Sequence, residues 1–402
     1  MSVYKGQGVL QIDNKEMEIP DLTLDTESAT IFGKAPFNGE SLKKIEASEE
    51  KRYADLALKN IELKGHSIVL KCEYLSEIFI SRRNMVGDQT GMRIEFEITP
   101  RCSELEFTVE GMNSAVSEIH YGEIKGIHRY EPIEITVGEQ KIRLFGNTDS
   151  FIAVVKDSDR RTLLEYKEIL RLGLSVAMGG EVPYLGYYFQ PELKYVINLV
   201  HRKASCGGRL IAPLYLSNFL DKFVNSKIGK KCQKYEMALT YYLLGKESDI
   251  NLLLKIISLF TSVEFFDGSK TMSKERLKQT FGIDSCEAVF YMKFRNMIVH
   301  HRGDVSAAVA EARSEAKKEM QRNSTPCEFI ENICRAKLDD QKELMKTLIG
   351  IKKRMISFID KHILREIGYT GSYLNCLNSY NEAKLEKIMM RDQQIFERLK
   401  NL

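Results

Sequence analysis

The sequence predicts an α+β protein of several domains, in which an antiparallel β-sandwich or barrel-like domain precedes an all-helical bundle. Seven of the 8 prolines and 18 of the 26 glycines precede residue 214, so turns are concentrated in that part. Short segments there alternate apolar and polar residues, whereas later apolar residues recur at helical spacing. We therefore divide the chain into a β-rich region (1–157), a mixed connecting region (158–213) and a helical region (214–402).

The clearest strands carry an apolar residue at every second position. Ile94, Phe96 and Ile98 alternate with charged residues, which places the apolar side chains on one face of a strand. Many short strands joined by Gly, Asn and Asp turns are typical of an antiparallel sandwich or barrel. The predicted strands are 2–12, 22–32, 67–80, 94–98, 105–109, 133–137, 141–145 and 151–155.

Helical spacing begins near Ser158. The first helix has apolar residues at Leu163, Tyr166, Leu170 and Leu174, and Gly179-Gly180 is a suitable end for it. From residue 214 the chain is predicted to be one helix after another. The signals are Asp249 as the cap of a helix to Phe266, a capping box from Asp284 to Glu287, and Thr325-Pro326 opening a helix to about Gly368, with a final helix over 381–400.

The charge balance excludes a histone-like polycation and an acidic disordered tail. Lys plus Arg total 59 and Asp plus Glu total 56, so the net charge is +3 and any nucleic-acid contact must come from a local basic site. The first ten residues contain no apolar signal core, and the apolar stretch 250–266 is interrupted by Asn251, Lys255 and Glu264. We expect a cytoplasmic protein without a membrane partner.

Cysteine spacing and sequence motifs give no sign of a metal or cofactor. The 8 cysteines are scattered without a C-x-x-C pair, so we expect reduced, mostly buried thiols. There is no Walker loop and no H-E-x-x-H, and Gly6-x-Gly8 lacks the rest of a dinucleotide fingerprint. His66, His120 and His128 are isolated in the β-rich region, where we expect structural or surface roles.

The most informative segment is the basic stretch 293–302. It contains Lys293, Arg295, His300, His301 and Arg302, and no acidic residue lies between Glu287 and Asp304. Arginine binds phosphate oxygens in a bidentate manner, and histidine exchanges protons near neutral pH. On a continuous helix, Asn296 and His300 are four residues apart and share a face, while Arg295 lies about 100° round from Asn296. The segment therefore predicts a phosphate site at a helix end.

This segment resembles the R-[polar]-x(3–5)-H motif of HEPN domains, through Arg295, Asn296 and His300. HEPN domains are helical bundles, and many are metal-independent endoribonucleases. The apolar helix before the motif, the acidic–aromatic stretch 262–266 and the segment 170–180 are similar to ApeA-like HEPN proteins of bacterial antiphage defence. The close resemblance covers about residues 235–310. His301 departs from the pattern, since many members have Gly or Tyr there.

The resemblance implies a mechanism in which RNA supplies its own nucleophile, the 2′-hydroxyl. His300 would act as general acid or base, Arg295 would stabilise the phosphate transition state, and Asn296 would orient His300 or the phosphate. The products would carry 2′,3′-cyclic phosphate ends. Auxiliary roles are expected for His301, Arg302 and Glu264.

The partners implied by the resemblance are RNA, with tRNA as one candidate, and a second copy of the chain, because HEPN nucleases build one cleft from two motif copies. A phage-derived protein is the expected trigger for the β-rich region, and the biological role would be abortive infection. The alternative is a non-catalytic HEPN dimerisation or scaffold module whose β domain binds a protein or glycan. A third hypothesis is a protein that holds a small phosphate ligand.

Each site residue also has a structural interpretation. Arg295 could pair with Glu264 or Glu287 and hold helices together, and the histidines could form a polar helix end. Lysines are further candidates for RNA backbone contacts, although a solvated junction explains the second cluster equally: Lys293, and Lys230, Lys231 and Lys234. Tyr235, Tyr241 and Tyr242 follow that cluster, where they would stack on bases or fill the core.

Overall fold

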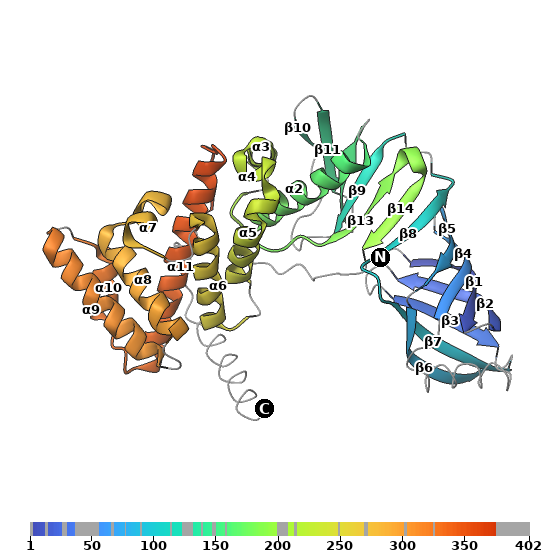
Figure 1. Cartoon of the computed structure of the whole chain (residues 1–402), viewed down its shortest axis with the longest axis horizontal. Coiled ribbons are helices and arrows are strands. Elements are labelled where there is room, and N and C mark those ends of the chain that lie inside the picture. The colour runs from blue at the N-terminus through green and yellow to red at the C-terminus, as the bar shows by residue number, and fades with distance from the viewer. Residues whose placement is uncertain are drawn as a thin grey trace. The chain divides into compact units, whose positions relative to one another are not determined.

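In the computed structural model, two compact units are formed by residues 1–167 with 183–203 and by residues 168–182 with 204–402 (Figure 1). The structure describes residues 3–374 except 13–14, 26–29, 37–55, 66–67, 77, 89–90, 113–114, 123–131, 138–139, 147–149, 157–158, 199–207, 213–214, 248–249, 269–271, 301–303 and 325. The connecting region 158–213 is thus divided between the two units. No helix of the described chain is long and apolar enough to cross a membrane.

The first unit is a single antiparallel sheet. Its 14 described strands lie in the order β10-β11-β12-β9-β13-β14-β8-β5-β4-β1-β2-β3-β7-β6. The bounds are β1 Val3–Ile12, β2 Lys15–Asp25, β3 Thr30–Pro36, β4 Leu56–Lys64, β5 Val69–Leu75, β6 Ile78–Asp88, β7 Gly91–Pro100, β8 Glu104–Glu110, β9 Ser117–Gly122, β10 Ile133–Val137, β11 Gln140–Gly146, β12 Ser150–Val155, β13 Tyr184–Phe189 and β14 Lys194–Asn198.

Period-2 alternation explains the buried face of this sheet. Ile94, Phe96 and Ile98 of β7 are at most 2% exposed, while β8 alternates buried apolar residues with exposed polar ones. Strand β6 ends the strand order and also contacts β4, so this part of the sheet curls toward itself. The predicted antiparallel β-rich region is confirmed, and its strands join in one sheet rather than two.

Two predicted strands are each divided in the structure. The segment 67–80 contains β5 and β6, and 22–32 covers the end of β2 and the start of β3. Gly6 and Gly8 flank a register shift in β1, where a Cβ at Gly6 would lie 1.7 Å from the Glu62 carbonyl oxygen. The close backbone approach therefore explains this G-x-G as a strand irregularity.

The second unit is helical. Helix α2 (Arg160–Met178) ends at Gly179 with φ +69°, which confirms the predicted stop. The later helices are α3 Leu216–Asn225, α4 Lys227–Lys230, α5 Cys232–Lys246, α6 Leu252–Asp267, α7 Lys274–Phe281, α8 Ser285–His300, α9 Val305–Asn323, α10 Glu328–Arg335 and α11 Gln341–Glu366, and the short 3-10 turn η1 Gln190–Glu192 lies between β13 and β14.

The single long helix predicted to run to Gly368 is wrong, because the chain forms α10 and α11 instead. Asp340 caps α11 by accepting from the backbone N–H groups of Lys342 and Glu343 at 2.8 and 3.3 Å, so a new helix begins there. The predicted end is confirmed, since Gly368 follows α11 with φ +67°. Asp249, Thr325 and the predicted helix 381–400 lie outside the described residues.

Two other cap predictions differ in detail. Asn251 caps α6 by accepting from the Leu253 N–H at 2.8 Å. The helix predicted to open at Asp284 is confirmed, since α8 begins at Ser285 and the Ala288 N–H donates to the Asp284 carbonyl at 2.9 Å, but the Glu287 side chain of the expected capping box has another partner. The Glu287 carboxylate is held by Arg354 of α11, because a buried charge is stabilised more by a guanidinium than by one backbone N–H.

Candidate functional site

Helix α8 carries the motif, and an aromatic core fixes its rotation. Phe290, Tyr291 and Phe294 are at most 1% exposed. The ring of Phe294 packs edge-on against Phe260 of α6, with the ring centroids 6.1 Å apart. Because successive helical residues are rotated by about 100°, burial of Phe294 turns Arg295 toward the edge of the α6–α8 contact.

Polar contacts with Glu264 and Asn296 hold Arg295 at this edge. Its Nη2 lies 2.8 Å from Glu264 Oε1, and its Nη1 donates to Asn296 Oδ1 at 3.3 Å. The Arg295 and Glu264 side chains are 21% and 23% exposed, although the Glu264 Oε1 atom that faces the guanidinium is itself buried. The structure therefore brings together three of the predicted site residues, from two helices, at a partly open surface.

His300 is the last residue of α8, one helical turn after Asn296. Its side chain lies outside the described residues, as do His301 and Arg302 in full. The next described residue, Asp304, caps α9 by accepting from the Ala307 N–H at 3.0 Å. The backbone thus places the end of α8 and the start of α9 at a helix junction, where the basic segment 300–302 falls.

The predicted RNA-contacting lysines fall into two groups. Lys293 Nζ lies 2.6 Å from Glu311 Oε1 of α9, and these side chains are 34% and 45% exposed. Lys230 and Lys231 are exposed where α4 meets α5, and Lys234 is exposed on the first turn of α5. Only Lys293 shares a helix with Arg295, and the second group connects to it through the packed helices α5 and α6.

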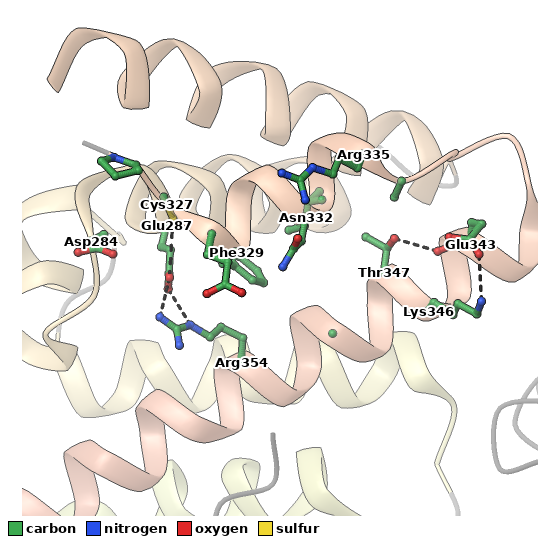
Figure 2. Close-up of a pocket in the computed structure, with 15 residues that line it drawn as sticks. Asp284, Glu287, Cys327, Phe329, Asn332, Arg335, Glu343, Lys346, Thr347 and Arg354 are labelled. Carbon is green, nitrogen blue, oxygen red and sulfur yellow. Dashed lines mark hydrogen bonds and ion pairs between the residues drawn. The ribbon is translucent and has the colours of Figure 1, made fainter. Parts of the chain in front are cut away.

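A cavity of about 840 Å³ lies at the other end of α8, between α10 and α11 (Figure 2). Its inner end holds Glu287, which is 1% exposed. Arg354 donates to both carboxylate oxygens, from Nε at 3.1 Å and from Nη2 at 2.6 Å. This pairing raises the pKa of Arg354, while burial raises the pKa of the neighbouring Tyr291 hydroxyl well above its usual value.

One group in the described chain has the spacing of metal ligands. One ligand atom from each of Asp284, Glu287 and Cys327 lies within 4.8 Å of the others. Burial raises the pKa of the Cys327 thiol, which keeps it protonated, and the Arg354 guanidinium already supplies the positive charge beside Glu287. The ion pair between Arg354 and the buried Glu287 therefore accounts for the charge in this group.

Sequence reasoning missed this group. Cys327 and the two acids are separated by about forty residues, so no local spacing motif joins them. The one local signal for this group was Glu287, because it is an acid in a mostly apolar stretch. Nothing near it in the sequence indicated that its partner would be Arg354 of α11.

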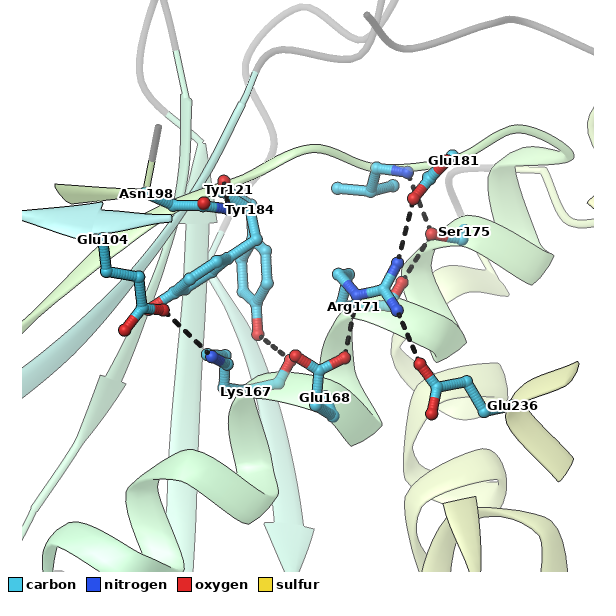
Figure 3. Close-up of polar contacts among 11 residues, drawn as sticks. Glu104, Tyr121, Lys167, Glu168, Arg171, Ser175, Glu181, Tyr184, Asn198 and Glu236 are labelled. Atoms are coloured by element: carbon cyan, nitrogen blue, oxygen red, sulfur yellow. Dashed lines mark hydrogen bonds and ion pairs between the residues drawn. The ribbon is translucent and has the colours of Figure 1, made fainter. Parts of the chain in front are cut away.

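The segment 170–174 that supported the resemblance has a structural role within the helical unit. Arg171 contacts three carboxylates, Glu168 at 3.0 Å, Glu181 at 3.3 Å and Glu236 of α5 at 3.8 Å (Figure 3). Its side chain is 15% exposed. Arg171 therefore links the second half of α2 to α5 through an ion pair.

Of the three histidines predicted to have structural or surface roles, the structure describes His120. His120 Nε2 lies 3.2 Å from Glu118 Oε2, and the ring packs edge-on against Tyr195 with centroids 5.6 Å apart. His66 and His128 lie outside the described residues.

Comparisons with protein-family models, with curated proteins and with solved structures found no match to this chain.

Proposed function

We propose that the chain is a HEPN-type endoribonuclease that cleaves RNA without a metal ion. The observation that carries the proposal is the cluster of Arg295, Asn296 and Glu264 at a partly exposed edge of α8, one turn before His300. A partly exposed guanidinium can bind a phosphate in a bidentate manner, and its contacts with Glu264 and Asn296 hold it in position for that task.

In the proposed reaction, the RNA 2′-hydroxyl attacks the adjacent phosphorus and the bond to the 5′-oxygen breaks. His300 transfers a proton to or from these oxygens, and Arg295 stabilises the charge that develops on the phosphate. Asn296 orients either His300 or the phosphate. The products are a 2′,3′-cyclic phosphate and a 5′-hydroxyl.

The proposal includes two partners. A second copy of the chain would contribute the second motif of the cleft, and an activating partner, of which a phage protein is one candidate, would act on the β-rich unit. The expected role is antiphage abortive infection, with tRNA as one candidate substrate.

The test is RNA cleavage in EDTA by the full chain, using total tRNA and RNA from phage-infected cells. His300→Ala is expected to lower the cleavage rate by about 10²- to 10⁴-fold, since a general acid or base contributes that factor. His301→Ala is the matched control, because it removes the neighbouring imidazole. Loss of cleavage in both variants would show that His300 and His301 share the acid–base role. Equal cleavage by the wild type and both variants would reject an acid–base role for His300.

One observation favours the scaffold alternative. The ion pair between Arg295 and Glu264 joins α8 to α6, which is the contact expected if Arg295 only holds helices together. Glu264→Gln separates the two functions. A scaffold role predicts that the substitution acts on the α6–α8 contact alone, with no RNA cleavage to alter, whereas the nuclease predicts altered RNA cleavage.

A further inference from the structure

An aromatic pair lies beside the motif, on the adjacent face of α6. Phe265 follows Glu264 directly, and its ring stacks on Tyr241 of α5 with centroids 5.9 Å apart and ring planes 9° apart. Phe265 is 45% exposed, although an aromatic ring is among the side chains that gain most from burial. Glu264 in turn contacts Arg295, so the ring pair and the motif are joined through consecutive residues.

The neighbouring aromatic residue behaves differently. Phe266 packs against His362 of α11 with ring centroids 5.0 Å apart, and it also contacts Tyr235. Phe266 is thus part of the packing between helices. The ring of Phe265 instead stacks on Tyr241, and 45% of its surface stays exposed.

The exposed face of α5 extends this surface. Lys234, Met237 and Tyr241 recur at intervals of three and four residues, which places them in one stripe along the helix. Met237 is 45% exposed, and Lys234 is exposed with its Nζ 5.9 Å from the Tyr235 ring centroid. Within the part of the chain that the structure describes, Lys230, Lys231 and Lys234 form no ion pair with a carboxylate, so the stripe ends in uncompensated positive charge.

We propose that this stripe binds an unpaired segment of RNA, with one base stacked against the Tyr241–Phe265 ring pair and the phosphates near Lys230, Lys231 and Lys234. Aromatic rings combined with a basic track are the usual means of binding single strands, because bases within a duplex do not expose their faces. The inference rests on the proposed function and adds a substrate class to it, which is RNA that is single-stranded next to the cleavage site.

The test uses a 2′-O-methyl RNA oligonucleotide with 2-aminopurine at one unpaired position. This RNA has no 2′-hydroxyl, so the wild-type full chain can be used without cleavage. Stacking on the ring pair is expected to change the 2-aminopurine fluorescence on binding. Phe265→Ala is expected to weaken binding by about 5- to 100-fold and to abolish the stacking signal, since one base–aromatic stack is worth that factor.

Three controls define the result. Phe265→Leu keeps an apolar side chain without a ring and is expected to lose the signal as Phe265→Ala does. Leu254→Ala removes another exposed apolar residue of α6, 54% exposed, and is expected to bind as the wild type does. The same oligonucleotide paired with its complement is expected to bind without dependence on Phe265.

The outcomes separate this inference from the nuclease proposal. Wild-type affinity and signal in Phe265→Ala would overturn the stacking site even if His300-dependent cleavage is observed. A stacking signal without any cleavage of natural RNA would retain the site and reject the nuclease. Conversion of a dimer to a monomer by Phe265→Ala, measured by light scattering, would instead assign the face to contact between copies and overturn the inference.

Discussion

The two halves of helix α8 use the same kind of contact in different surroundings. In the first half, Glu287 is 1% exposed and both of its oxygens are held by Arg354, whose own side chain is 32% exposed, so the buried member of this pair is the carboxylate. In the second half, Arg295 is 21% exposed and contacts Glu264 through one nitrogen and one oxygen. Breaking the buried pair (Glu287 with Arg354) would leave a carboxylate charge in the core, whereas in the open pair (Arg295 with Glu264) both side chains are about a fifth exposed and a phosphate can compete for the guanidinium.

Between the two ion pairs of α8, the larger effect on RNA cleavage is expected at the open pair. Arg295→Ala is expected to lower RNA cleavage by about 10²- to 10³-fold, as loss of one transition-state contact does. The unfolding free energy should change by less than about 1 kcal/mol, since the pair is solvent-accessible. Cleavage kinetics and urea denaturation measure the two effects. Arg295→Lys is the matched control, because it keeps the charge and loses the planar fork, and unchanged cleavage in Arg295→Ala would remove this residue from the mechanism.

The buried pair is expected to show the opposite pattern. Arg354→Ala leaves Glu287 without its counter-charge and should lower the unfolding free energy by about 2–4 kcal/mol. The double variant Glu287→Leu with Arg354→Met should recover most of that loss, because it leaves no buried charge. Urea denaturation measures both. If the unfolding free energy of Arg354→Ala lies within about 0.5 kcal/mol of the wild type, the Glu287–Arg354 pair is no more important for stability than an exposed pair.

A second carboxylate anchors the start of α8 and gives a pH test. Glu319 Oε1 accepts from Lys274 at 2.7 Å, Ser285 at 2.9 Å and Asn323 at 2.8 Å, and these bonds lower the Glu319 pKa to about 2. A carboxylate whose pKa is lower in the folded state stabilises the protein above its unfolded pKa of about 4.3, and this contribution is lost as the pH falls through about 2.

Glu319→Gln should therefore lower the unfolding free energy by about 1–2 kcal/mol at pH 7, with less difference from the wild type near pH 2. Denaturation at several pH values from 7 to 2 measures this dependence. Parallel curves for the two proteins would show that Glu319 does not anchor α8 through its charge.

The smallest effect is expected at Lys293, which shares its helix with both pairs. Its ion pair with Glu311 is exposed, so Lys293→Ala should change the unfolding free energy by less than about 0.5 kcal/mol. If Lys293 contacts an RNA phosphate, the slope of log affinity against log salt should fall by about 1. Glu311→Gln is the control, because it frees the lysine and should leave that slope unchanged or steeper.

Some boundaries were predictable because they depend on local chemistry. Gly179 and Gly368 adopt positive φ at helix ends, and Ile94, Phe96 and Ile98 alternate in a strand, so single residues and short patterns decided these features. The break between α10 and α11 was missed, because the apolar spacing continues across it and only Asp340, acting as a cap, starts a new helix.

The sequence by itself determined the division into a β-rich and a helical part, the motif formed by Arg295, Asn296 and His300, and the lysines around residue 230. Only the tertiary structure decided that β13 and β14 join the sheet between β9 and β8. It also decided that Arg295 contacts Glu264 while Arg354 holds Glu287, and that Phe265, next to Glu264, remains exposed. The physical reason is the distance over which each feature acts. Turns, caps and alternation depend on neighbouring residues, whereas ion pairs and burial depend on which distant helix is packed alongside.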